Sequence, residues 1–165
     1  MRNIAIVLVT LISFTVSATE QIRDILIYKT DTLGISTYPL EFLIKTDPFI
    51  NKRVLHYSNT ICESSDCWRK HVGTWKIVND SLFLTKLTNG CENHIFNLTK
   101  VFSKRKTQNR KVFANWYTGE IKAMFYNKDV SNSSTEKYRL IKSFSAKIIN
   151  GKITNISIET ISKNN

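Results

Sequence analysis

Alternation of hydrophobic and polar residues predicts that most of this chain forms β-strands. The clearest case is a hairpin around the Asn-Asp turn at 79–80, which has β-branched and aromatic residues on both sides. A two-residue loop places Ile77 opposite Leu82. The same register places Trp75 opposite Leu84, so the four side chains share one face, as a buried face requires.

A second hairpin is predicted around the Asn-Gly turn at 150–151. Both turn positions tolerate positive φ, and the flanking segments 145–149 and 152–158 are rich in isoleucine. Two isoleucines of the second segment fall on opposite faces of a regular strand. A β-bulge near Asn155 would bring them into line.

The other strands are predicted from shorter patterns. Segment 35–43 is expected to be an edge strand or irregular, because Pro39 lacks the N–H that a central ladder needs. The remaining strands are expected at 21–28, 52–57, 111–117, 120–126 and 136–144.

One short helix is predicted at about 97–106. Asn97 is a good N-cap, and Leu98, Val101 and Phe102 follow the helical spacing. Three cations come next, where they suit the C-terminal end of a helix dipole.

These elements predict one mainly β domain over residues 19–165, with a frayed C-terminal tail. The expected architecture is an antiparallel sheet, sandwich or partly open barrel with one short α-helix. A chain of 165 residues, 42% of them hydrophobic, suits one globular domain and is too short for a TIM barrel. The expected core residues are Ile25, Ile27, Leu40, Trp75, Ile77, Leu82, Leu84, Leu98, Phe102, Phe113, Trp116, Ile121, Leu140 and Ile148.

Residues 1–18 have the layout of a secretory signal peptide. A basic start at Arg2 is followed by an apolar run and by small residues before Thr19. The alternative is an N-terminal membrane anchor, but the apolar run is shorter than the ~20 residues that span a bilayer. We therefore expect an exported protein, periplasmic or extracellular, with no transmembrane segment in the mature chain.

Export makes a disulfide the expected state of cysteine. Of the three cysteines, Cys67 and Cys91 are the predicted pair, because extending the first hairpin brings Trp68 opposite Cys91. A one-residue bulge, with Gly73 as the natural candidate, would then align Cys67. The bridge would contribute about 3 kcal/mol on the loop-entropy model. The competing pair is Cys62–Cys67.

A metal site is the weaker interpretation of the same residues. Cys62, Cys67, Cys91 and His94 form a C-x4-C-x23-C-x2-H pattern, which lacks the close ligand pairs at both ends that are typical of zinc knuckles. Cys67 and His71 could serve as nucleophile and base, but no orienting group is apparent. The sequence predicts no cofactor.

Enzyme motifs give little support for catalysis. The chain has no H-E-x-x-H, G-x-S-x-G, G-x-G-x-x-G or P-loop pattern. A cleft that gathered His71, Arg69 and a carboxylate such as Glu92 or Glu120 would favour an enzyme. Without such a cleft, a non-catalytic protein is the better prediction.

Charge adds a candidate binding surface. The formal net charge is +11, from 24 Lys and Arg against 13 Asp and Glu. A basic patch would suit phosphate groups, anionic lipid or an acidic protein, and the alternative is a solvated connection. Nucleic acid is not favoured, because it would need stacking aromatics beside the cations. The patch consists of Lys100, Lys104, Arg105, Lys106, Arg110 and Lys111.

Two resemblances accompany these patterns. Gly73-x-Trp75 resembles the Gly-x-Trp signature of lipocalins, which implies a calycin-like barrel. Residues 67–120 resemble uncharacterised exported β-rich proteins of Bacteroidota, which implies origin and compartment. The motifs that carry this second resemblance are Cys67-Trp68-Arg69, the hairpin 75–84 and the segment 111–120.

The sequence predicts an exported, non-catalytic binding or interaction domain. Its partner is an unknown protein, an envelope surface or a small ligand. The alternative is a small-ligand carrier of the calycin or lipocalin-like barrel type, which a large enclosed apolar cavity would favour. A third possibility is an enzyme with an unrecognised site.

The disulfide is directly testable. Non-reducing peptide mapping of protein exported from its own host is expected to recover a Cys67–Cys91 cross-link, because the hairpin closes around both residues. Recovery of free thiols alone would contradict the bridge.

Overall fold

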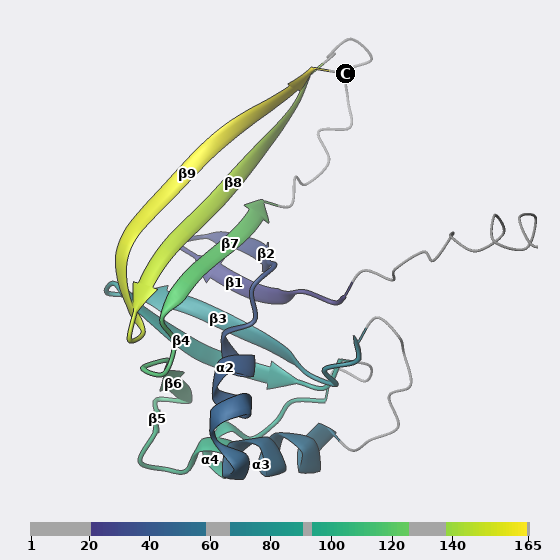
Figure 1. Cartoon of the computed structure of the whole chain (residues 1–165), viewed down its shortest axis with the longest axis vertical. Helices are drawn as coiled ribbons and strands as arrows, with labels where there is room; N and C mark the ends of the chain where they lie inside the picture. The colour runs from purple at the N-terminus through teal and green to yellow at the C-terminus, as the bar shows by residue number, and fades with distance from the viewer. Residues whose placement is uncertain (1–20, 59–66, 91–93, 126–137, 165) are drawn as a thin grey trace, which may run out of the picture.

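The computed structural model describes residues 21–58, 67–90, 94–125 and 138–164 (Figure 1). Strands dominate these residues, which confirms the mainly β class. The predicted signal peptide lies outside the described residues. The elements are β1 (Asp24–Tyr28), β2 (Asp31–Ile35), α2 (Pro39–Thr46), α3 (Pro48–Ser58), β3 (Val72–Val78), β4 (Ser81–Thr88), α4 (Leu98–Phe102), β5 (Thr107–Gln108), β6 (Lys111–Phe113), β7 (Gly119–Phe125), β8 (Tyr138–Ile149) and β9 (Lys152–Asn164).

Seven strands close into a barrel of mixed pairing. Around the ring the order is β3-β1-β2-β7-β8-β9-β4, and the β3–β4 hairpin joins the two ends. The pairs in this ring are antiparallel except for β1–β3, where Ile25 pairs with Thr74 and Ile27 with Lys76. β6 and β5 continue the sheet from β4. The predicted partly open barrel is thus closed.

The β3–β4 hairpin has the predicted register at its tip. Ile77 pairs with Leu82, and Trp75 pairs with Leu84. A bulge follows between Thr74 and Trp75, and the extra residue is Thr85 on β4. The bulge predicted at Gly73 of β3 is therefore wrong. Gly73 is needed for space instead, because a Cβ there would lie 2.8 Å from the Asp24 carboxylate.

The position of this bulge bears on the cysteines. An extra residue on β4 shifts the ladder away from the Cys67–Cys91 register, not toward it. Cys67 is buried, and its sulfur lies against Gly90, the residue before Cys91. Cys62 and Cys91 lie outside the described residues, so the bridge itself stays a prediction.

The β8–β9 hairpin matches its prediction closely. Its turn residues Asn150 and Gly151 have φ values of +48° and +76°. Thr154 is the extra residue of a bulge, lying between the rungs formed by Ile153 and Asn155. The predicted bulge near Asn155 is confirmed.

The barrel closes where the tips of the two hairpins meet. A single rung, Ser81 with Lys152, joins β4 to β9. The Leu82 N–H donates to the Gly151 carbonyl at 2.9 Å, which extends this contact into the turn. A Cβ on Gly151 would lie 2.7 Å from the Ala114 carbonyl oxygen. Closure therefore requires glycine at position 151.

Helix α2 replaces the edge strand predicted at 35–43. Pro39 is the first residue of the helix, where a missing N–H costs nothing because that group has no partner within the helix. Leu40 and Leu43 are spaced three apart and buried. Pro39 alone is compatible with a strand edge, but together with these leucines it marks the start of a helix.

Helix α3 likewise replaces the strand predicted at 52–57. The Asp47 carboxylate accepts hydrogen bonds from the N–H groups of Phe49 and Ile50, at 3.0 and 3.1 Å. Ile50 and Val54, four residues apart, face the core. The Asp-Pro dipeptide at 47–48 is thus a helix cap followed by a first-turn proline.

Helix α4 confirms the predicted cap but is shorter than predicted. The Asn97 side-chain oxygen accepts from the N–H groups of Thr99 and Lys100. The helix ends at Phe102, because Ser103 has a φ of +74°. The cations at 104–106 therefore lie in the following turn. Within the described residues, no helix combines the length and apolarity needed to cross a bilayer.

Large side chains fill the barrel interior. Trp75 and Phe144 are at most 1% exposed. The ring of Trp116 lies between those of Trp75 and Phe102, with centroid distances of 6.5 and 5.9 Å. Tyr117, which was not predicted as core, is 1% exposed. The expected core residues that are buried are Leu40, Trp75, Leu82, Leu84, Leu98, Phe102, Ile121 and Ile148.

The remaining core predictions differ in detail. Ile25 and Ile27 are only half-buried, because β1 turns Asp24 and Leu26 inward instead. Ile77, Phe113 and Trp116 are also half-buried, and the side chain of Leu140 lies outside what the structure describes.

Gly151 provides a test of barrel closure. Gly151→Ala is expected to lower the free energy of unfolding by on the order of 3 kcal/mol, because alanine is strained at positive φ and its Cβ meets backbone. Urea unfolding measures the loss. The control is Gly119→Ala, whose Cβ would meet only the end of the Tyr117 side chain, at 3.1 Å. Equal losses in the two variants would contradict the closure argument.

Candidate anion-binding cleft

A cleft of about 420 Å³ opens beside the closing rung of the barrel. Strands β4, β6 and β9 line it together with the turn after α4. Figure 1 shows the tip of the β8–β9 hairpin close to β4 and β6. We call this cleft the basic cleft. Its lining residues are Ser81, Phe83, Arg105, Lys106, Gln108, Lys111, Phe113, Asn115 and Lys152.

Two phenylalanines hold two of the ammonium groups in place. Phe83 and Phe113 are direct partners across β4 and β6, with ring centroids 5.6 Å apart. The Lys111 ammonium lies 4.7 Å from the Phe83 centroid, and that of Lys152 lies 5.4 Å from the Phe113 centroid. Lys152 also donates to the Ser81 hydroxyl at 2.8 Å. Cation–π attraction and this hydrogen bond preposition both charges.

The turn between α4 and β5 brings in two further cations. Ser103 reverses the chain at positive φ, and its carbonyl accepts from the Thr107 hydroxyl at 2.9 Å. Arg105 and Lys106 are exposed on this turn and line the basic cleft. The lining therefore carries four cations and no carboxylate.

The structure divides the predicted basic patch. Arg105, Lys106 and Lys111 meet in the basic cleft. Arg110 lines a separate recess. Lys100 is exposed on α4, and Lys104 is exposed without lining the basic cleft.

Sequence analysis missed Lys152 and the two phenylalanines. These residues are 30 or more positions apart in the chain, and only the strand order brings them together. The aromatics that nucleic acid would need are thus beside the cations. However, a lysine ammonium lies over each ring, so a base would have to compete with that lysine for the ring face it occupies.

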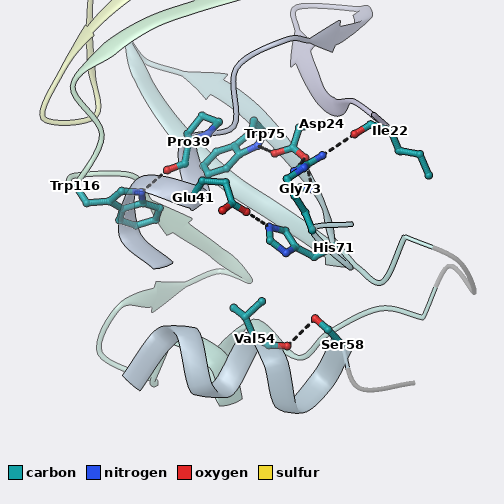
Figure 2. A network of polar contacts seen from close by, with 11 residues as sticks. Ile22, Asp24, Pro39, Glu41, Val54, Ser58, His71, Gly73, Trp75 and Trp116 are labelled. Atoms are coloured by element: carbon teal, nitrogen blue, oxygen red, sulfur yellow. Dashed lines mark hydrogen bonds and ion pairs between the residues drawn. The ribbon is translucent and has the colours of Figure 1, made fainter. Parts of the chain in front are cut away.

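A separate polar network lies buried at one end of the barrel (Figure 2). The Asp24 carboxylate, 0% exposed, accepts hydrogen bonds from the Arg69 guanidinium and the Gly73 N–H, both at 3.0 Å. The Trp75 indole N–H donates to its other oxygen at 2.9 Å. Arg69 also stacks on the Tyr38 ring, with its guanidinium carbon 3.7 Å from the centroid. The charge on Asp24 is therefore fully compensated.

His71 and Glu41 form a second pair beside this network. The Nε2 atom of His71 lies 3.2 Å from a Glu41 carboxylate oxygen, and His71 is 2% exposed (Figure 2). The contact with His71 lowers the pKa of Glu41 below 4.5, and the charges of Arg69 and Lys45 act in the same direction. Burial of the Glu41 carboxyl raises its pKa, but by less than these contacts lower it. The pair ties α2 to the start of β3.

The residues expected to form an enzyme cleft do not meet in that way. His71 and Arg69 lie side by side in the interior, but their carboxylate partners are Glu41 and Asp24. Glu120 pairs with Lys122 on β7 at 3.4 Å. Glu92 lies outside the described residues. The buried network holds the fold together, and none of its residues lines the basic cleft or the recess that contains Arg110.

The zinc interpretation gains no support from the part of the chain that the structure describes. No three His, Cys, Asp or Glu residues gather there as metal ligands. His94 is exposed, and its ring packs toward Phe96 with centroids 6.5 Å apart. Cys67 is buried, while Cys62 and Cys91 lie outside the described residues.

A scan against protein-family models gave no match to this chain, and searches of curated proteins and of solved structures gave none either. The resemblance to exported proteins of Bacteroidota stays a prediction. Function must therefore be argued from the basic cleft and the buried network.

The Glu41–His71 pair predicts a pH dependence of stability. A carboxylate whose pKa is lowered in the folded state contributes stability above its unfolded pKa, and this is lost as pH falls through the folded pKa. Glu41→Gln is expected to cost about 1 kcal/mol at pH 7. The difference from wild type should shrink below pH ~4.5.

Unfolding by urea at a series of pH values measures this difference. Glu120→Gln is the control, because Glu120 pairs only with an exposed lysine. A Glu41→Gln cost that stayed constant from pH 7 to pH ~3 would show that the carboxylate charge plays no part.

Proposed function

We propose that this chain is an exported, non-catalytic binding domain that takes a multiply charged anionic ligand in the basic cleft. The observation that carries the proposal is the gathering of four cations from three separate chain segments, without a carboxylate in the lining. Like charges repel, so such a group is costly unless an anion compensates it. Its assembly favours anion binding over a solvated connection.

The geometry supports particular chemistry for the ligand. Lys111 and Lys152 supply ammonium groups that the phenylalanine rings already position, so little side-chain freedom is lost on binding. Arg105 adds a guanidinium that can bind a phosphate, sulfate or carboxylate group through two hydrogen bonds. The amides of Gln108 and Asn115 add neutral donors and acceptors. A ligand with several oxyanion groups would use all of these.

The carrier alternative is less well supported. A closed barrel is compatible with a carrier, but side chains fill the interior of this one. Leu26, Leu33 and Trp75 are 0% exposed within it. A ligand at the outer face of β4, β6 and β9 needs no displacement of these residues. The external basic cleft is therefore the better binding site.

The test is calorimetric titration with inositol hexakisphosphate, a compact polyphosphate. Lys111→Ala/Lys152→Ala is expected to weaken binding about tenfold or more, because it removes two prepositioned charges. The matched control, Lys122→Ala/Lys142→Ala, removes two exposed cations outside the basic cleft. It should leave the affinity within about twofold.

Added salt should weaken binding to the wild-type protein. Urea unfolding of both double variants checks that each is folded. Equal losses in the two variants would show that net charge alone attracts the probe, and the proposal would fail. No binding by the wild-type protein would also overturn it.

A further inference from the structure

We infer that the face formed by α2 and α3 is a docking surface for an anionic phospholipid bilayer. Three large apolar side chains are exposed there: Phe42 by 53%, Phe49 by 77% and Leu55 by 51%. The two helices pack against each other, and Figure 1 shows them at the end of the molecule opposite the C-terminal end of β9. We call this surface the α2–α3 face.

Phe42 contacts the core with one edge, because its ring lies 5.3 Å from that of buried Tyr117, but half of its surface stays exposed. Phe49 and Leu55 are not among the buried residues of the core. Leu40 and Leu43 are the buried leucines of α2, and Ile50 and Val54 are the buried aliphatic residues of α3. The exposed residues of α3, from Phe49 to Leu55, lie on the opposite side of the helix. α3 therefore has one buried apolar side, and in addition it carries Phe49 and Leu55 on the side that faces solvent.

The charges on the α2–α3 face are cationic. Lys45 and Lys52 are exposed, one on each helix, and Lys52 lies between Phe49 and Leu55 on the helical surface. The two acidic residues here are engaged by other groups: Glu41 contacts buried His71, and the partly exposed Asp47 carboxylate accepts from the backbone N–H groups of Phe49 and Ile50. The more exposed charged side chains of both helices are thus cationic.

Neighbouring elements add to this field. Lys100 is exposed on α4, which packs against α3. Arg53 donates to the Val101 carbonyl at 3.1 Å and joins the two helices. Lys100 is a member of the basic patch that does not line the basic cleft. It lies instead on α4, the helix next to the α2–α3 face.

This combination fits an anionic bilayer better than a protein partner. Aromatic and leucine side chains insert at the boundary between headgroups and acyl chains, while lysines reach anionic headgroups around them. Lysine stems also pack along apolar surface and keep their charge in water. The cores of protein interfaces, by contrast, are depleted in lysine. This inference does not depend on the basic cleft.

The experiment is co-sedimentation of the full chain with phosphatidylcholine vesicles that contain about 30% phosphatidylglycerol, compared with phosphatidylcholine alone. Phe49→Ser/Leu55→Ser is expected to bind the anionic vesicles about tenfold more weakly, with no change in folding. Lys45→Glu/Lys52→Glu should weaken binding as well, by an amount that added salt reduces. Neutral vesicles should bind the wild-type protein poorly.

The matched control is Ile149→Ser/Ile158→Ser, which removes two exposed apolar side chains from β8 and β9. It should bind vesicles like the wild-type protein. The inference is overturned if this control loses as much as Phe49→Ser/Leu55→Ser. It is also overturned if Lys111→Ala/Lys152→Ala alone abolishes binding, since the headgroups would then bind in the basic cleft.

A protein partner is the remaining competitor, and a second copy of the chain can be tested directly. Sedimentation equilibrium without lipid should show a monomer. A dimer that Phe49→Ser/Leu55→Ser dissociates would assign the α2–α3 face to self-association and overturn lipid docking. Failure of this inference leaves the polyphosphate titration of the basic cleft unaffected.

Discussion

The fold depends on a buried carboxylate. Asp24 begins β1 inside the barrel, and its charge is stable there only because three donors compensate it, one of them the Arg69 guanidinium. Two of the donors, Gly73 and Trp75, belong to β3. The network therefore fixes the parallel β1–β3 pairing, without which the ring would stay open. Removing one partner would leave a buried charge and cost about 3–5 kcal/mol.

The ring also closes between β4 and β9, where the contact is made by backbone groups and borders the basic cleft. The turns of the two hairpins meet there through Gly151, and a single rung pairs Ser81 with Lys152. The same lysine is one of the two prepositioned ammonium groups in the basic cleft. Fold and site thus share residues, and an anion bound to Lys152 would stabilise the closed ring over an open one.

Features that depend on a few neighbouring residues, such as turns and helix caps, were predicted correctly from the sequence. The Asn-Asp and Asn-Gly turns fixed two hairpin registers, and Asn97 capped its helix as predicted. Helices α2 and α3 were not predicted, because a proline such as Pro39 or Pro48 is compatible with a strand edge as well as with the first turn of a helix. The basic cleft could be predicted only in part. Arg105, Lys106 and Lys111 are close in sequence, but their meeting with Lys152 depends on non-local strand order.

The net charge of +11 is not spread evenly, because some of the acidic side chains are engaged inside the fold. Asp24 and Glu41 are directed into the interior, and Asp47 is used as a helix cap. These three acids therefore extend no carboxylate among the exposed lysines of the α2–α3 face, and the basic cleft has no carboxylate in its lining. The two surfaces differ in what accompanies the charge. Phenylalanines beneath lysines in the basic cleft fix the ammonium groups, whereas those on the helices are exposed beside them. This difference is the basis for proposing an oxyanion ligand for the basic cleft and the surface of an anionic bilayer for the α2–α3 face.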